Sequence, residues 1–305
     1  MTVARQVPLR FQVGARTIAV LRRDLVQVPL SLDAALSGRL PMLPPLDLGA
    51  QGYLVTSLPT DRRDALAWAA GGLIAATRQR YTRRYVDLTI GVDGYLDRLS
   101  TNMRSAIRRK TRKLVASGGP LDIRRFATPQ EMAVFHPAAR AIATRTYQER
   151  LLGAGLPGTP DFLDGMYRAA AAGNVRGWLL AIGGKPVAYL YCPIEDGVAG
   201  YRYVGHDPVF NDLSPGAVLQ AEALRDLLAT PGLKRFDFTE GDGQHKRQFA
   251  TGGVDCVDLL LLRPSPANRA ATWALSGFDG GVALARRHAA RLGLAAFVRK
   301  AIRAG

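Results

Sequence analysis

The sequence predicts an α/β protein built around a mixed β-sheet, and the order of elements in its second half supports this. Three β-like runs follow one another through turns that contain glycine, and a helical pattern at 216–229 then precedes two further runs. The five strands are expected at residues 175–182, 187–194, 198–204, 234–238 and 254–262. An antiparallel meander that feeds a strand–helix–strand crossover combines antiparallel and parallel pairing in one sheet.

The first half of the chain also has a mixed α/β pattern. Short β-like runs occur at 9–13, 17–21 and 85–90. Thr60 is expected to cap a helix whose apolar positions lie on one side, and the proline-rich and glycine-containing segment 41–52 is expected to be a loop.

Helices are expected between the two halves. One is predicted at 100–115, another at 130–152 with a kink at Pro137, and a third at 160–172 with Thr159 as its cap. These helices complete the layers that a mixed sheet needs on its faces.

Composition places the chain among ordinary globular proteins. It has 305 residues, which suits one large domain or two fused ones, and 48% of them are hydrophobic. Two cysteines, Cys192 and Cys256, are too few for a disulfide framework and are expected to be small buried residues. The sequence shows no signal peptide or membrane span, so we expect a cytoplasmic protein. Its 41 basic and 25 acidic residues give a net charge of +16, which favours anionic partners.

The helix expected at 100–115 is strongly basic. Arg104, Arg108 and Arg112 recur every four residues and therefore share one face. This face is either an ordinary solvated surface or a surface that binds phosphates, an acidic carrier protein or lipid headgroups. Aromatic residues for base stacking are absent from this stretch, so nucleic acid is disfavoured.

Three motifs follow one another in the second half of the chain: Tyr201-Arg-Tyr-Val-Gly-His-Asp-Pro208, Leu213-Ser-Pro-Gly216 at a helix start, and Phe236-Asp-Phe-Thr-Glu-Gly-Asp242 followed by Lys246. Together these motifs resemble the GNAT family of acyltransferases. The segment 99–110 resembles the entry helix of the CelD-like branch, which is related to the FemAB peptidyltransferases. One departure is His245-Lys246, where that branch has a Tyr-Lys pair.

The resemblance implies a GNAT fold over about 95–262. The chain length suits a doubled GNAT architecture with a degenerate N-terminal half. We therefore expect an N-terminal α/β half at 1–95, a GNAT-like domain at 96–263 and a basic amphipathic tail at 264–305.

The resemblance also implies transfer of an acyl or aminoacyl group from a thioester or ester to an amine. A helix start exposes backbone N–H groups that bind phosphate, and Ser214-Pro215-Gly216-Ala217 supplies one, with Ser214 as the cap. We expect this segment, with Lys246, Arg104 and Arg108, to bind the donor. The expected donor is acyl-CoA or an acyl carrier protein. The loop is poorer in glycine and basic residues than the usual GNAT loop, which favours a carrier protein or a tRNA over free coenzyme A, and the segment could instead be an ordinary capped helix start.

Amide formation needs a base for the amine nucleophile and donors for the oxyanion. Asp237, Glu240 and His245 follow a strand end, where ligands bind in open sheets, and His206 ends the preceding strand. Each of the four is a candidate catalytic residue, and each could instead be a turn or ion-pair residue. The four histidines show no paired metal-ligand spacing, so no metal is expected.

The segment 264–305 carries seven basic residues and one acidic residue. One helical face collects Leu294, Phe297, Val298, Ala301 and Ile302. This pattern is typical of a helix in an anionic membrane interface, although a helix that packs on its own domain has the same pattern. On the membrane interpretation the acceptor is a lipid amine, such as a sphingoid base.

Two alternatives stay open at this stage. A FemAB-like transferase would use aminoacyl-tRNA, and the basic charge would hold the RNA. A catalytically silent GNAT-like module would serve as a scaffold in envelope polysaccharide or lipid assembly.

Overall fold

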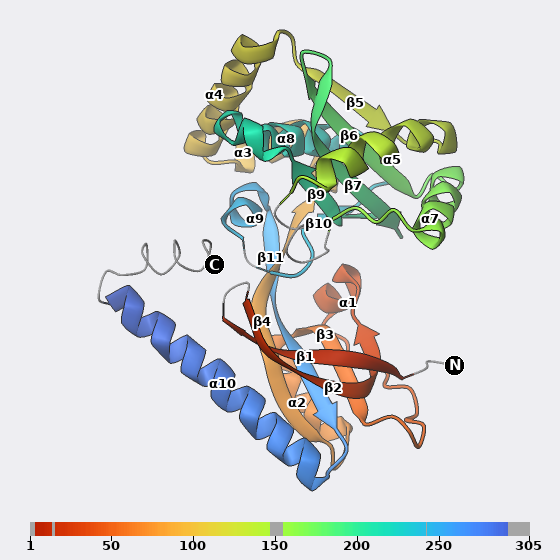
Figure 1. The fold of residues 1–305 in the computed structure, drawn as a ribbon, viewed down its shortest axis with the longest axis vertical. Coiled ribbons are helices and arrows are strands. Elements are labelled where there is room, and N and C mark those ends of the chain that lie inside the picture. The colour runs from red at the N-terminus through yellow and green to blue at the C-terminus, as the bar shows by residue number, and fades with distance from the viewer. Residues whose placement is uncertain (1–3, 14–15, 147–154, 242, 292–305) are drawn as a thin grey trace. The chain divides into compact units, whose positions relative to one another are not determined.

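The computed structural model describes residues 4–13, 16–146, 155–241 and 243–291 (Figure 1). The chain forms two compact units: one comprises residues 1–82 together with 254–305, and the other comprises Arg83–Gly253. The boundaries expected from the sequence lie near 95 and 263 instead. The difference arises because the last strand and the helix after it pack with the N-terminal residues, far away in sequence.

The first unit is a sheet with helices on its faces. Its strands lie in the order β1-β2-β3-β11-β4. The elements are β1 (Arg5–Val13), β2 (Arg16–Pro29), α1 (Leu32–Ser37), β3 (Gly52–Pro59), the 3₁₀ turn η1 (Thr60–Arg62), α2 (Arg63–Ala69), β4 (Ile74–Asp87), β11 (Gly252–Leu262) and α10 (Pro266–Arg291). Helix α1 and strand β3 were not expected from the sequence. Thr60 was expected to be a helix cap, whereas Thr60 lies inside η1 and α2 begins at Arg63.

Helix α10 is part of the core of the first unit. Leu275 is buried against apolar residues of the sheet, and the Phe278 ring makes an edge contact with Phe11 of β1 at 5.3 Å between centroids. Arg78 of β4 pairs with Asp279 at 2.7 Å. The expected amphipathic face at Leu294, Phe297, Val298, Ala301 and Ile302 lies outside the described residues.

A buried polar cluster joins β3, β4 and β11. Asp258 Oδ1 accepts hydrogen bonds from the Ser57 backbone N–H at 3.0 Å and from the Tyr81 hydroxyl at 3.1 Å, and the Ser57 hydroxyl lies 2.8 Å from that of Tyr81. Ser57 has a positive φ of 59°, and the pairing of β11 with β3 is irregular next to it. Burial raises the pKa of Asp258, although these hydrogen bonds oppose the shift.

The raised pKa makes a testable prediction about stability. A carboxyl whose folded-state pKa lies above its unfolded value contributes stability at low pH that is lost as the pH rises through the folded pKa. Asp258→Asn keeps the Oδ1 acceptor and removes this titration. Denaturation of both proteins between pH 3.5 and 7 is therefore expected to show the variant gaining stability relative to the parent as pH rises. A constant difference across this range would contradict the assignment.

The second unit contains a mixed sheet, as expected. Its strands lie in the order β4-β10-β8-β7-β6-β5, with β9 paired to β7. The pairing of β10 with β8 is parallel and the other pairings are antiparallel. The strands are the end of β4 with β5 (Asp122–Phe126), β6 (Val175–Ile182), β7 (Lys185–Glu195), β8 (Val198–Gly200), β9 (Tyr203–His206) and β10 (Arg235–Asp237).

Helices cover both faces of this sheet (Figure 1). They are the 3₁₀ turn η2 (Leu88–Ile90), α3 (Gly91–Arg98), α4 (Thr101–Gly118), α5 (Pro129–Ala143), α7 (Pro160–Ala171), the 3₁₀ segment η3 (Pro208–Leu213), α8 (Pro215–Leu228) and α9 (Gln244–Phe249). Alternation along β7 separates the two cores: Leu190 and Cys192 face α3, α4 and α8, while Tyr189 and Tyr191 face α5 and α7.

Most of the expected helix starts are confirmed, and their caps differ in detail. The Ser100 hydroxyl accepts from the Met103 N–H to start α4, and Thr128 with Glu131 forms a capping box at α5. Thr159 stands at the cap position of α7 but its side chain makes no capping bond. Helix α5 contains Pro137 and ends at Ala143, before the expected end, and residues 147–154 lie outside the described part of the chain.

Candidate functional site

A bulge interrupts the strand that precedes α8 and divides it into β8 and β9. At this bulge β9 separates from the neighbouring strand β10. Ala199 of β8 pairs with Ile194 and Tyr203 of β9 pairs with Tyr191, so this strand has one residue more than β7 between the two pairs. Strand β8 pairs with β10, whereas β9 pairs with β7 alone in the described part of the chain. The Tyr201 N–H donates to the Asp237 carbonyl at 2.8 Å. Beyond this bond β9 carries an edge that β10 does not cover.

Tyr201 lies at the point where the strands part. Its ring contacts those of Phe238 and His245, with centroids 5.6 and 6.0 Å apart, and its hydroxyl donates to Gln220 Oε1 of α8 at 3.3 Å. Burial raises the pKa of Tyr201, so the phenol stays protonated and remains a hydrogen-bond donor at neutral pH. Aromatic side chains therefore fill the point where β9 and β10 separate, so a ligand would bind beside this point.

Gln220 has an unusual environment for an amide. The residue is only 3% exposed, and its Nε2 is buried with no hydrogen-bond partner among the described residues. Leaving such a donor unpaired costs about 1–3 kcal/mol. A ligand with an acceptor oxygen would satisfy it.

His245 is the candidate base that contacts Tyr201. It lies in the first turn of α9, and the residue as a whole is exposed. Partial burial of the imidazole, followed by the charge of Lys246, lowers the pKa of His245 below its ordinary value of 6.5. The ring is therefore mostly neutral at pH 7 and able to accept a proton.

Lys246 and Asp237 have partners within the protein. The Lys246 ammonium donates to the backbone carbonyls of Phe238, at 2.7 Å, and of Glu240. Asp237 is buried and accepts hydrogen bonds from Arg83 of β4 and, at 2.8 Å, from the Thr239 N–H. Both side chains hold the turn after β10, where Thr239 has a positive φ of 60°. The Glu240 residue is exposed on this turn.

His206 ends β9 next to the start of α8. Its Nε2 lies 2.7 Å from Asn211 Oδ1, and a Cβ on Gly216 would lie 3.4 Å from its Nδ1. Glycine at 216 therefore lets the imidazole sit directly against the first turn of α8. The structure thus places His206 beside the expected donor segment 214–217 and His245 beside Tyr201.

The start of α8 differs from the expected cap. Ser214 stands at the cap position in a left-handed conformation with φ of 53°, and its side chain makes no capping bond. Its carbonyl accepts from the N–H of Ala217 at 3.1 Å, and Pro215 occupies the first turn. The expectation that the Ser214 hydroxyl caps the helix is therefore wrong, because the left-handed backbone takes the place of an extended cap residue.

Basic residues surround the loop that leads into α8. The Lys113 ammonium of α4 donates to the Asp212 carbonyl at 2.8 Å, and Arg145 pairs with Asp207 at 2.9 Å. Burial alone would raise the pKa of Asp207, but hydrogen bonds from the Val209 N–H and Arg145 outweigh it and hold the pKa below its usual range. The loop is thus fixed by cations on two sides.

The structure separates Arg104 and Arg108 from Lys113. Arg104 is nine residues before Lys113, so the two side chains leave α4 on opposite sides, and Arg108 is turned away by roughly 140°. Arg104 Nε is buried without a hydrogen-bond partner in the described residues. The four-residue spacing of the arginines predicts a basic face on α4. Only the tertiary structure shows which face of α4 lies against the loop that leads into α8.

Comparison with known proteins finds a family model that matches the part of the chain containing this site. Residues 101–247 match the family model described as the acetyltransferase (GNAT) domain. No curated protein sequence is similar enough to the chain to be matched. None of the helices in the described residues combines the length and apolarity needed to cross a bilayer.

Two solved structures share the fold. FemX is 12% identical, with 86% of this chain and 89% of that chain covered and a TM-score of 0.51. The C-terminal domain of a protein described as a lysylphosphatidylglycerol synthetase from Agrobacterium fabrum is 13% identical, with 75% and 71% covered and a TM-score of 0.50. The bulged strand, the crossover helix α8 and the domain match together show that residues 101–247 form a GNAT domain, and the likeness to FemX is one of fold.

Proposed function

We propose that this GNAT protein is an N-acyltransferase that moves an acyl group from a thioester, acyl-CoA or acyl carrier protein, to an amine. The observation that carries the proposal is the parting of β9 from β10 at Tyr201, beside the start of α8. The uncovered edge of β9 offers backbone groups to an extended donor. The first turn of α8 offers its positive dipole end and the Gly216 N–H to the donor's phosphates, since Pro215 has no N–H and those of Ala217 and Val218 donate to the Ser214 carbonyl. Lys113 lies next to that turn and adds positive charge.

The residues near Tyr201 suit the chemical step. The amine nitrogen attacks the thioester carbonyl carbon, the C–S bond breaks, and the amine proton passes to a base that returns it to the departing thiolate. His245, with its lowered pKa, is the base in this proposal. The unpaired Gln220 Nε2 is the donor for the carbonyl oxygen, which gains negative charge, and the Tyr201 hydroxyl orients this amide by donating to its Oε1.

The other expected residues take supporting roles. Asp237 and Lys246 fix the turn that carries Glu240, and His206 packs against the donor helix start. We keep His206 and Glu240 as alternative bases, because both lie at ends of the parting strands. Arg104 and Arg108 belong to a separate anion-binding surface in this proposal.

Donor choice is tested by thermal unfolding with added ligands. A ligand that binds only the folded state raises the melting temperature, with about 2.7 kcal/mol of stabilisation at a hundredfold excess over Kd. We expect an acyl-CoA to raise it and deacylated tRNA to leave it unchanged. Stabilisation by tRNA alone would favour the FemAB-like alternative, and no response to either ligand would favour a scaffold.

We also propose that the protein acts on the cytoplasmic side of a membrane and binds it peripherally through α10. Trp273 is 82% exposed and Leu284 is 56% exposed, and eleven residues of helix place them on the same side of α10. An exposed Trp and Leu on a helix in a basic segment fit an anionic lipid interface. A lipid amine as acceptor would explain this surface.

Vesicle co-sedimentation tests the membrane proposal. Removing α10 would expose the core around Leu275, so point variants are the sharper tool. Trp273→Ser is expected to lower binding to vesicles that contain anionic lipid several-fold, whereas Trp68→Ser, which changes an equally exposed Trp on α2, is expected to leave it unchanged. Equal binding by both variants and the parent would show that α10 is not the membrane-binding surface.

A further inference from the structure

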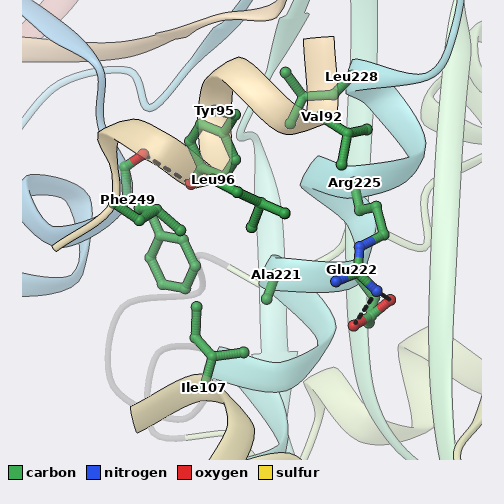
Figure 2. A pocket seen from close by; sticks show the side chains of 10 residues that line it. Val92, Tyr95, Leu96, Ile107, Ala221, Glu222, Arg225, Leu228 and Phe249 are labelled. Atoms are coloured by element: carbon green, nitrogen blue, oxygen red, sulfur yellow. Dashed lines mark hydrogen bonds and ion pairs between the residues drawn. The ribbon is translucent and has the colours of Figure 1, made fainter. Parts of the chain in front are cut away.

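A small apolar cavity lies between α3, α4, α8 and α9, outside the groups used for the proposed chemical step. It encloses about 40 Å³. Its apolar lining includes Val92, Leu96, Ile107, Ala221, Leu228 and Phe249 (Figure 2). Since one water molecule needs about 10–15 Å³ by this measure, the cavity has room for about three groups of that size, such as methylene groups.

The walls of this cavity are firmly positioned. The Tyr95 hydroxyl donates to the Phe249 carbonyl at 2.9 Å and so ties α3 to the end of α9 (Figure 2). Phe249 is 2% exposed, whereas Ile107 and Ala221 are half-buried. Glu222 and Arg225 pair at 3.3 Å on the α8 side. A cavity with apolar walls and a charged pair at one side suits an alkyl chain and offers little to a polar ligand.

The cavity adjoins the candidate site through two helices. Phe249 follows His245 by four residues on the same side of α9, about 6 Å along the helix. Ala221 directly follows Gln220 on α8. Along α8 the order is therefore the helix start at Pro215, the unpaired Gln220, and then the cavity wall at Ala221 and Leu228.

We infer that this cavity binds the acyl chain of the thioester donor. The inference rests on the proposed function, because the order along α8 puts phosphates at one end, the carbonyl near Gln220 and the alkyl chain beyond it. The protein would accordingly prefer thioesters with a medium or long apolar chain over acetyl thioesters. The ion pair Glu222–Arg225 would then lie where the bound acyl chain meets solvent.

Binding of a thioester series to the intact protein tests this inference. Isothermal titration with coenzyme A and its acetyl, hexanoyl, decanoyl and hexadecanoyl thioesters is expected to show affinity rising about fourfold for each methylene that enters the cavity. Ala221→Leu adds three carbons to the cavity and is expected to lower affinity for the longer thioesters on the order of 50-fold. Its affinity for coenzyme A should stay unchanged.

Two further variants keep the test independent of folding defects. Ala116→Leu makes the same chemical change at an exposed position of α4 and should behave like the parent. Ile107→Ala enlarges the cavity and should shift the preference toward longer chains. Melting temperatures without ligand identify any variant that has lost its fold.

The outcomes separate this inference from the proposed function. If acyl-CoA binds with an affinity that is independent of chain length, or if Ala221→Leu and Ala116→Leu behave alike, the cavity assignment is wrong and the transferase proposal stands. If n-alkylamines lose affinity in Ala221→Leu while the thioesters do not, the cavity belongs to the acceptor and the inference is overturned. If no thioester binds the parent, both fall together.

Discussion

Replacing His245 by glutamine is expected to lower turnover about 100-fold or more while leaving donor binding intact. General acid–base catalysis contributes typically 10²–10⁴-fold, and glutamine cannot accept the amine proton. The measurement is release of free thiol from an acyl-CoA in the presence of an amine, with donor Kd determined separately by calorimetry. His288→Gln, an exposed change on α10 in the other unit, is the matched control and should keep full activity.

The pH profile gives the same prediction a second readout. Because the pKa of His245 is lowered, the imidazole is neutral above that pKa and protonated below it. Parent turnover should therefore fall as pH drops through a value below 6.5, and His245→Gln should lack this limb. If His245→Gln keeps near-parental turnover and the same fall of turnover at low pH, the base is His206 or Glu240.

Replacing Asp237 by asparagine is expected to cost about 3–5 kcal/mol of unfolding free energy. The variant leaves Arg83 as a charge in a buried setting, where Asp237 is 5% and Arg83 is 8% exposed. Chemical denaturation measures the change. Asp122→Asn, which breaks an exposed pair with Arg124 at 3.2 Å, is the control and should cost less than about 1 kcal/mol.

A double variant separates a structural role of Asp237 from a catalytic one. Arg83→Met with Asp237→Leu removes both charges, and replacing a buried ion pair by apolar groups is often neutral for stability. If Asp237 only fixes the turn after β10, the double variant should regain most of the stability and a measurable part of the turnover. Recovery of stability with complete loss of turnover would instead return Asp237 to the catalytic residues.

The regular elements of the second unit were predictable because local signals agreed with tertiary demands. Strands β6 and β7 show the expected apolar runs, and the Ser100 cap starts α4 where the sequence places it. The first unit was harder. Strand β3 begins at Gly52, inside a stretch read as a loop, and its burial comes from pairing with β11, about 200 residues away.

The location of the candidate site was predictable from the sequence, but the roles of its residues were not. The run that contains Tyr201 was noted, yet nothing local shows that its ring meets His245. Gln220 did leave a signal, since it is the polar residue on the buried face that carries Val218, Leu219, Ala223 and Leu224. Asp237 looked like a base because its partner, Arg83, is more than 150 residues away.

Hydrogen–deuterium exchange with and without an acyl-CoA tests most directly whether a donor binds along β9 and the start of α8. A donor bound there would cover backbone N–H groups that the sheet leaves to solvent. The account predicts slowed exchange in residues 203–218, with no change in the β1–β2 hairpin. Protection confined to other segments, with 203–218 unaffected by a saturating thioester, would contradict it.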